Sequence, residues 1–317
     1  MQSDKILVIG ANGQLGSVLS LELQKLHGKK NVILSDINAN KKSNNNFEII
    51  DATDIKQIEN LVKKYSVDQI YHLAAILSAK GEKTPLLTWD INMRMTLNVF
   101  EIAKKYNLSK VFFPSSIAVF GDKAKLKDTP QSSILNPATV YGMTKAAGEN
   151  WAQYYFDKHG LDIRSIRYPG IIGYQSMPGG GTTDYSLEMY HSAVKKEKYI
   201  CYLNSDTKLP MIYMEDAVRS TLEIMQSPME NISIRTSYNI ASMSLSPIEI
   251  ASEIQKVYPD FKVEYCKDFR QNIADKWPNS INDQNARNDW NWKPKYDLSQ
   301  MTKLMLENLK EIYNTTT

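Results

Sequence analysis

The sequence has few of the residues that build covalent or metal-bound frameworks. Its 317 residues include only two cysteines, Cys201 and Cys266, which lie far apart in the chain. This count argues against a disulfide framework and excludes a cysteine-rich metal site. The four histidines show no spacing typical of metal ligands. We therefore expect no metal in the functional site.

Long apolar runs and a strong charge imbalance are also missing. No apolar run reaches the roughly 18 residues that a membrane-spanning helix needs. The net charge is only +3, and lysines alternate with acidic residues along the chain, which is too mild and scattered to indicate nucleic-acid binding. An apolar strand begins almost at once, with no signal or transit peptide before it. We expect a cytoplasmic protein that binds neither membranes nor nucleic acids.

The first pattern that is present is a strand, a glycine-rich turn and a helix. Apolar residues 5–9 stop at Gly10, and Gly13 and Gly16 follow before a helical pattern that continues to Leu26. In this context the backbone turns tightly, approaches a pyrophosphate and offers it a helix N-terminus. The spacing is GxxGxxG and not the usual GxGxxG, and a glycine-capped turn without a ligand is the alternative. The turn predicts a dinucleotide site.

Carboxylates follow the next two strands. The strand at 31–35 leads into Asp36, twenty residues past Gly16, where an acid is expected to accept a hydrogen bond from the ribose 2′-hydroxyl of NAD. The same carboxylate would repel the 2′-phosphate of NADP. A third strand at 47–50 leads into Asp51 and Ala52, and Asp51 could reach the adenine amino group. An ordinary loop aspartate is the alternative for Asp36, but the combination predicts NAD as the cofactor.

Strands and helices alternate through the first half of the chain. Helices are predicted at 55–65, 85–106 and 141–160, and strands at 69–72, 111–113 and 163–168. This order predicts an α/β fold with a Rossmann-type doubly wound parallel sheet and its ligand at the carboxyl ends of the strands. We assign residues 1–170 to an NAD-binding domain and 171–317 mainly to a smaller C-terminal α/β substrate-binding region, with some elements returning to the first domain. Residues 38–46 are expected to form a surface loop, and residues 315–317 to fray.

Hydroxyl and amino groups gather around the strand at 111–113. The strand ends in Ser115 and Ser116, and Tyr141 and Lys145 follow at a spacing that places both on one face of a helix. A lysine cation beside a phenol favours the phenolate and lowers the pKa of the phenol, so that it becomes a usable general base. Ser116 can bind the same substrate oxygen. A surface helix that carries Tyr and Lys by chance is the alternative.

In their order along the chain these motifs resemble the extended short-chain dehydrogenase/reductase family, which includes the nucleotide-sugar epimerases. That resemblance implies a homodimer through helices that include the Tyr/Lys helix. The aromatic side chains Trp151, Tyr154, Tyr155 and Phe156 would lie in this interface, with core packing as the alternative. The residues expected to contact NAD are Gly10, Asn12, Gly13, Gln14, Leu15, Gly16, Asp36, Asp51, Ala52, Leu73, Ala74, Ala75, Asn92, Ser115, Tyr141, Lys145 and Tyr168.

The most distinctive stretch is the GGGTTDY segment at 179–185. Its glycines give a backbone that can fold over a ligand, and a flexible loop before an ordinary helix cap is the alternative. The segment resembles the short-chain-type L-threonine 3-dehydrogenases, as do LSAKGE at 77–82, RQNIADKWP at 270–278 and WNWKP at 290–294. In the last of these Asn291 replaces the usual glycine, in a loop where we expect no effect on the chemistry.

That resemblance implies NAD-dependent oxidation of the β-hydroxyl of L-threonine to 2-amino-3-oxobutyrate. Tyr141 would be the base, Lys145 would lower its pKa and hold the nicotinamide ribose, and Ser116 would bind the substrate hydroxyl. The residues expected to bind or enclose the amino acid are Ser78, Ser116, Tyr141, Thr182, Thr183, Asp184 and Trp277. Asp184 would bind the ammonium group or cap the following helix.

Three other functions remain open on this sequence. A nucleotide-sugar 4-epimerase or dehydratase shares the catalytic trio but needs a nucleotide pocket that the GGGTTDY segment does not suggest. A dehydrogenase of another β-hydroxy amino acid, such as serine or allothreonine, would need the same residues. An NAD-sensing regulator on the same fold commonly lacks the Tyr/Lys pair, and the presence of this pair here argues against one. The zinc-dependent class of threonine dehydrogenases is excluded, because the cysteines and histidines cannot form its metal sites.

Overall fold

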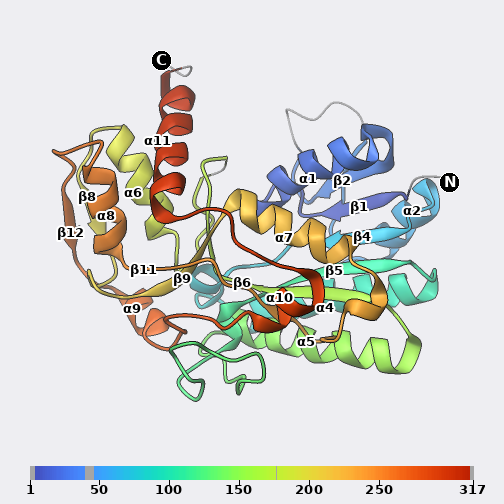
Figure 1. Ribbon diagram of the computed structural model, residues 1–317. Helices are drawn as coiled ribbons and strands as arrows, with labels where there is room; N and C mark the ends of the chain where they lie inside the picture. Colours follow the sequence, from blue (N-terminus) through green and yellow to red (C-terminus); the bar gives the residue numbers. More distant parts are fainter. Residues whose placement is uncertain (1–3, 40–45, 176, 315–317) are drawn as a thin grey trace.

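The computed structural model describes residues 4–39, 46–175 and 177–314, and its main element is a seven-stranded parallel sheet (Figure 1). In spatial order the strands are β10 (Tyr238–Asn239), β6 (Ile163–Tyr168), β5 (Lys110–Ser116), β4 (Gln69–His72), β1 (Ile6–Ile9), β2 (Val32–Asp36) and β3 (Phe47–Ile49). The predicted Rossmann-type fold is confirmed. The expectations for residues 40–45 and 315–317 lie outside the described residues.

Helices cover both faces of this sheet, which explains why its central strands are continuous apolar runs. The helices α1 (Gln14–His27) and α7 (Met214–Gln226) lie on one face, and α4 (Pro85–Lys105) and α5 (Val140–His159) lie on the other, as Figure 1 shows. All four residues of β1 are buried between the two layers. The helix α2 (Ile55–Tyr65) packs beside α4.

A smaller lobe is built from the C-terminal part of the chain, at the left in Figure 1. It contains the sheet β11-β9-β7, the two-stranded sheet β12-β8 and a core of its own, which includes Tyr185, Tyr190 and Met305. Its elements are β7 (Gly170–Ile172), α6 (Tyr185–Val194), β8 (Tyr199–Cys201), β9 (Leu209–Tyr213), β11 (Met243–Leu245), α8 (Pro247–Gln255), β12 (Val263–Tyr265), α9 (Phe269–Ala274) and α11 (Leu298–Asn314). The helix α10 (Gln284–Trp290) packs near β10 instead.

The long elements follow the sequence-based boundaries closely, and the short ones do not. The helix α6, which follows the GGGTTDY segment, ends at Val194, because Lys196 has a left-handed backbone (φ 60°). The one-turn helix α3 (Ser78–Gly81) and the three-residue strands β7 and β8 were not predicted, since segments this short show no periodicity. None of the helices in the described ranges combines the length and apolar character that a membrane crossing requires.

Candidate active site

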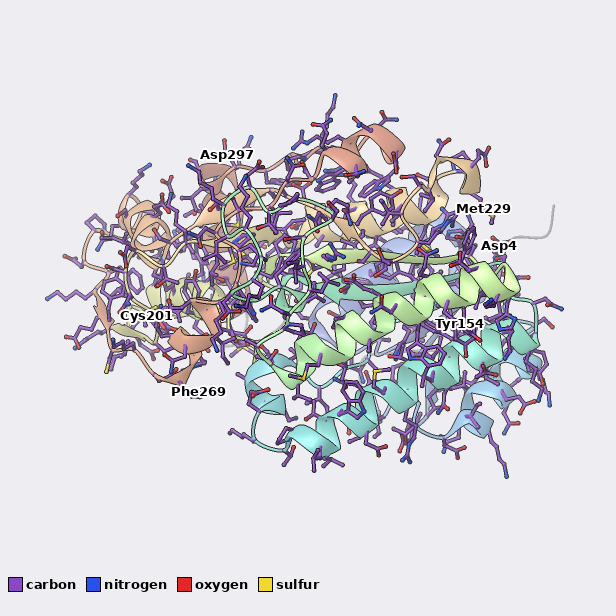
Figure 2. The ribbon with its side chains drawn as sticks, turned by 90° about the horizontal axis from the view of Figure 1, so that it is seen from below. Asp4, Tyr154, Cys201, Met229, Phe269 and Asp297 are labelled. Carbon is purple, nitrogen blue, oxygen red and sulfur yellow. The ribbon has the colours of Figure 1, made fainter. Side chains whose placement is uncertain are left out.

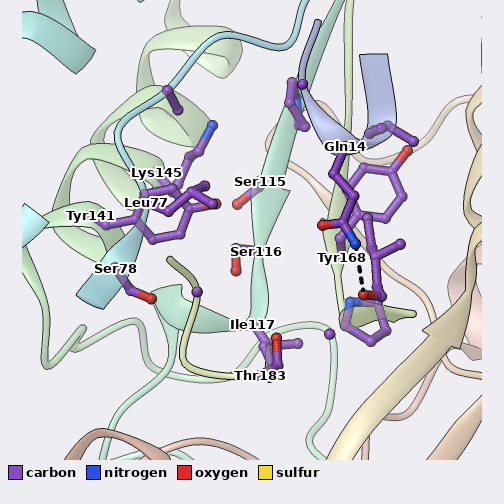
Figure 3. A pocket seen from close by; sticks show the side chains of 18 of the residues that line it. Gln14, Leu77, Ser78, Ser115, Ser116, Ile117, Tyr141, Lys145, Tyr168 and Thr183 are labelled. Atoms are coloured by element: carbon purple, nitrogen blue, oxygen red, sulfur yellow. Dashed lines mark hydrogen bonds between the residues drawn. The ribbon is translucent and has the colours of Figure 1, made fainter. Parts of the chain in front are cut away.

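A pocket lies at the carboxyl ends of β1, β4, β5 and β6, where the smaller lobe meets the large sheet (Figure 3). This edge is where open α/β sheets bind ligands. The structure brings most of the predicted site residues together here. Those that line the pocket are Gly10, Gly13, Gln14, Leu15, Gly16, Leu73, Ala75, Ser78, Ser115, Ser116, Tyr141, Lys145, Tyr168, Thr182, Thr183, Asp184 and Trp277.

The start of α5 places the predicted base in the pocket. Thr139 is the N-cap of this helix, and its hydroxyl accepts a hydrogen bond from the backbone N–H of Gly142 at 3.1 Å. Tyr141 therefore lies in the first turn, and its hydroxyl points toward the end of β5, which carries Ser115 and Ser116 (Figure 3). Lys145 lies one turn further along, with its Nζ 5.6 Å from the centre of the Tyr141 ring.

The charge states of this pair differ from the sequence-based expectation. Burial raises the pKa of Tyr141 to about 12, and a hydrogen bond with Ser116 opposes that rise. Burial lowers the pKa of Lys145 to about 7, and the charge of Glu149 opposes that fall. Loss of water on burial therefore dominates the pKa shift of each side chain. The Lys145 ammonium lies over the faces of two rings, 4.6 Å from the centre of Phe113.

The glycine-rich turn fits a pyrophosphate. Gly10 has a left-handed backbone (φ 90°), and a Cβ atom there would lie 2.6 Å from the backbone nitrogen of Ala74. A Cβ atom on Gly16 would lie 2.1 Å from the carbonyl oxygen of Gly10. Among the residues that the structure describes, no side chain caps the N-terminus of α1 at Gln14, so the amides of its first turn can bind phosphate.

Two of the predicted cofactor residues meet beside this turn. Asp36 ends β2, and its Oδ2 accepts a hydrogen bond from the backbone N–H of Asn12 at 3.1 Å. Its Oδ1 accepts a second bond from the N–H of Asn38 at 3.2 Å. The carboxylate is thus held next to the glycine turn, where the ribose of a bound dinucleotide would need it.

Asp51, Ala52 and Ala74, like Asn12 and Asp36, lie outside the pocket lining. Asp51 Oδ1 accepts hydrogen bonds from the backbone N–H of Thr53 at 2.8 Å and from the Thr53 hydroxyl at 2.7 Å. Ala52 is buried beside it. Asp51 thus shapes the loop after β3. Its second oxygen, Oδ2, is the atom left for a contact with adenine.

Asn92 and Tyr168 have their polar groups turned away from the pocket. The side-chain amide of Asn92 accepts a hydrogen bond from the N–H of Ile76 at 2.9 Å and donates one to the Ile76 carbonyl at 3.0 Å. It therefore fixes the loop after β4 and does not line the pocket. The Tyr168 ring lines the pocket, but its hydroxyl is hydrogen bonded to Thr221 on α7.

The GGGTTDY segment closes one side of the pocket. The Thr182 and Ser78 hydroxyl oxygens lie 3.1 Å apart and are hydrogen bonded, and both side chains are buried. Asp184 does not cap α6 with its side chain. Its Oδ2 instead accepts hydrogen bonds from the backbone N–H groups of Gly180 at 2.8 Å and Gly181 at 2.9 Å. Burial raises the pKa of Asp184, and these backbone amides oppose that rise.

Sequence reasoning missed two acidic residues that hold α5 in place. Glu82 Oε1 accepts a hydrogen bond from the backbone N–H of Val140 at 2.8 Å, across 58 residues of chain. Nothing in the sequence signals this contact. Glu149 lies fully buried behind the pocket, where it accepts a hydrogen bond from Ser115 at 2.5 Å. Its spacing of one helical turn from Lys145 was a signal that could have found it.

Three comparisons with known proteins bear on this site. A family model described as the NAD dependent epimerase/dehydratase family matches residues 6–241. An uncharacterized epimerase/dehydratase of Staphylococcus haemolyticus (strain JCSC1435) is 43% identical over 313 residues, which cover 97% of this chain and 98% of that protein.

Solved structures give a more specific similarity. A GalE-like L-threonine dehydrogenase from Cupriavidus necator in its holo form is 48% identical, with a TM-score of 0.95 over 96% of this chain and 100% of that one. A monomeric L-threonine 3-dehydrogenase from a metagenome, in its apo form, is also 48% identical, with a TM-score of 0.95 over 97% of this chain and 99% of that one. The predicted resemblance to L-threonine 3-dehydrogenases of the epimerase-like family is confirmed.

Proposed function

Because the chain belongs to the NAD-dependent epimerase/dehydratase family, we propose that it is an NAD-dependent L-threonine 3-dehydrogenase. The observation that carries the proposal is the meeting of two sets of residues in one pocket. Tyr141, Lys145 and Ser116 come from α5 and β5, and Thr182 and Ser78, hydrogen bonded to each other, line the same pocket. The relatives named L-threonine dehydrogenases support the substrate.

The residues around the glycine-rich turn are those that would hold the cofactor. The first amides of α1 would bind the pyrophosphate, Asp36 would bind the adenosine ribose, and Lys145 would bind the nicotinamide ribose. Bound NAD⁺ supplies the acceptor for the hydride that leaves Cβ of the substrate. The absence of an Arg near Asp36 in the sequence supports NAD and not NADP.

The chain's own groups would handle the proton of the substrate hydroxyl. Ser116 would hold the hydroxyl oxygen, and Tyr141 would take the proton as general base. Since burial raises the pKa of Tyr141 to about 12, the phenolate needs positive charge close by to form near neutral pH. Lys145 supplies such a charge when it is protonated, so its own charge state matters for the rate.

The smaller lobe would supply the substrate side of the pocket. Thr182, Thr183 and Trp277 all come from residues 171–317 and line the same pocket as Ser116. The indole N–H of Trp277 is buried and has no hydrogen-bond partner among the described residues. Polar groups that fix a small zwitterion while apolar surface excludes water are typical of such pockets.

We also propose a homodimer through α4 and α5. These helices lie side by side on the outer face of the sheet, and Tyr154 is on their surface (Figure 2). Trp151 and Tyr154 are 38% and 46% exposed, whereas Tyr155 is buried. The aromatic face thus divides between core and surface. Light scattering on the purified protein tests the dimer, and a monomer like the metagenome relative would contradict it.

The experiment that tests the proposed function follows NADH absorbance with a panel of substrates. We expect NADH to form with L-threonine and NAD⁺, and only weakly with L-serine or allothreonine. Parallel incubation with UDP-galactose and UDP-glucose tests the epimerase alternative. Interconversion of the nucleotide sugars without oxidation of threonine would overturn the proposal.

A further inference from the structure

We propose that Glu82 is a positioning residue, which holds the helix that carries Ser78 against the helix that carries Tyr141. It thereby fixes the separation between a hydroxyl that binds the substrate and the base that acts on it. The inference deepens the proposed function and rests on it, because threonine must contact both side chains at once. Glu82 is not among the residues that line the pocket, so it acts through Ser78 and Tyr141 and does not touch the substrate.

The one-turn helix α3 needs support from outside. It contains only the four residues Ser78–Gly81, with Glu82 as its C-cap residue. The Glu82 N–H donates to the Ser78 carbonyl at 3.2 Å, so the residue that ends the turn is bonded to the residue that begins it. A single helical turn is not stable alone, because forming it orders several residues for one hydrogen bond. The position of the Ser78 side chain therefore depends on the contacts that hold α3 in place.

The Glu82 carboxylate connects α3 to the start of α5. Its Oε1 accepts a hydrogen bond from the N–H of Val140 at 2.8 Å, and Val140 is the first residue of α5, directly before Tyr141. The first N–H groups of a helix have no partner within it. The Thr139 hydroxyl accepts from the N–H of Gly142, and Glu82 accepts from that of Val140. Both bonds restrain the turn that carries the base, and a carboxylate also suits the positive end of the helix dipole.

Two further hydrogen bonds connect α3 to its surroundings. Thr88 on α4 donates to the Gly81 carbonyl at 3.1 Å, and a Cβ atom on Gly81 would lie 2.9 Å from Cγ2 of Thr88. The Ser78 hydroxyl is bonded to that of Thr182 at 3.1 Å. Thr88 thus joins α3 to α4, Thr182 joins it to the GGGTTDY segment, and Glu82 joins it to α5. Removal of the Glu82 bond would leave α3 held to elements that do not carry the base.

This connection matters for the rate because the two ends of the substrate are held by different elements. In the proposed reaction the hydroxyl of threonine lies at Tyr141 on α5, while Ser78 on α3 and Thr182 hold the rest of the molecule. A displacement of about 1 Å between reacting groups can cost a hundredfold in rate. NAD binding should not depend on Glu82, since the glycine-rich turn and Asp36 belong to the opposite side of the sheet order, at β1 and β2.

The test compares Glu82→Ala and Glu82→Gln with the wild type. Glu82 is exposed, so both variants should fold. Ala removes the acceptor, whereas Gln keeps an oxygen that can accept the Val140 N–H. We expect kcat/KM for L-threonine to fall about three- to tenfold in Glu82→Ala, as for a lost hydrogen bond, and Gln to recover most of this loss. NAD affinity should stay unchanged in both. Wild-type kcat/KM in Glu82→Ala, or an equal loss in both variants, would overturn the inference.

A double-mutant cycle tests whether Glu82 acts through Ser78. Ser78→Ala removes the hydroxyl whose position Glu82 is proposed to set. If the two residues act together, Glu82→Ala should lower kcat/KM by a smaller factor in the Ser78→Ala background than in the wild type. The same factor in both backgrounds would mean that Glu82 acts on α5 alone, and the inference would fail.

Asp297→Ala is the matched control for loss of stability. Asp297 is also exposed, and its Oδ1 accepts a hydrogen bond from the N–H of Gln300 in the first turn of α11 at the same 2.8 Å. It does not line the pocket. Thermal unfolding should show similar losses of stability in Asp297→Ala and Glu82→Ala, with kcat/KM unchanged in the former. An equal fall in kcat/KM in both would show a purely structural effect and would overturn the inference.

Hydrogen exchange tests the connection without any substrate. The amides at the start of α5 should exchange faster in Glu82→Ala than in the wild type or in Glu82→Gln, because the Val140 N–H has lost its acceptor. Equal exchange in all three proteins would overturn the inference. Failure of the proposed function is distinguishable, since the wild type would then form no NADH from threonine while the difference in exchange would persist.

Discussion

The hydroxyl oxygens of Ser78 and Thr182 lie 3.1 Å apart, although 104 residues separate them in the chain. The bond joins the short helix after β4 to the segment that closes the pocket. We expect Thr182→Val, which keeps the shape and removes the hydroxyl, to raise KM for threonine by about tenfold or more, since a lost buried hydrogen bond costs about 1–3 kcal/mol. NAD affinity, measured by protein fluorescence, should not change. A loss of NAD affinity with unaltered KM would move Thr182 out of the substrate site.

Asp184 should act on the glycine loop and not on the substrate ammonium. Asn keeps an oxygen that can accept the bonds from Gly180 and Gly181, whereas Ala does not. We therefore expect KM for threonine to rise strongly in Asp184→Ala and to change only modestly in Asp184→Asn. If the carboxylate instead pairs with the ammonium group, both variants will show similarly large increases in KM.

Removal of the Asp36 carboxylate should weaken NAD binding. The carboxylate is positioned by the N–H groups of Asn12 and Asn38 and would accept a bond from the ribose. Asp36→Ala is expected to raise the NAD dissociation constant by about tenfold, because it removes a charge-assisted hydrogen bond. Titration calorimetry measures this directly. Without the carboxylate, NADP should bind more tightly than it does to the wild type. An unaltered dissociation constant for NAD would remove Asp36 from the cofactor site.

Lys145 should lower the stability of the protein below the pH at which it loses its proton. Its pKa is lowered from 10.5 in a free side chain to about 7 in the fold. The unfolded chain therefore binds more protons between these values, and stability rises with pH across that window. Lys145→Met should be more stable than the wild type at pH 7 and below, and the difference should shrink as the pH approaches 10. Thermal unfolding of both proteins across this pH range measures the difference in stability. A difference that does not change with pH would contradict the burial of a titrating Lys145.

The long elements of the fold could be predicted from the sequence because periodicity and turn chemistry act locally. The run at Ile6–Ile9 and the glycines that follow it each carry their own signal. The meeting of Tyr141 and Lys145 in one pocket could be predicted for the same reason, since they share one helix. Their charge states could not, because burial depends on which rings and strands surround them.

The contacts that hold the site depend on tertiary structure and leave little trace in sequence. Glu82 reaches the first amide of α5 from a loop 58 residues earlier, and Asp184 turns back on its own loop and does not cap α6. An aspartate directly before a helix reads as a cap. Only the backbone path of Gly180, with its left-handed φ of 93°, brings the amides to the carboxylate.

The most direct test of the whole account is the rate of NADH formation from L-threonine by the wild type and by Tyr141→Phe, with NAD binding measured on the same samples. Loss of the phenolic oxygen should lower kcat by a factor on the order of a hundred or more while NAD binds as before. A Tyr141→Phe protein that turns over threonine at a near-normal rate would contradict the assignment of Tyr141 as the base.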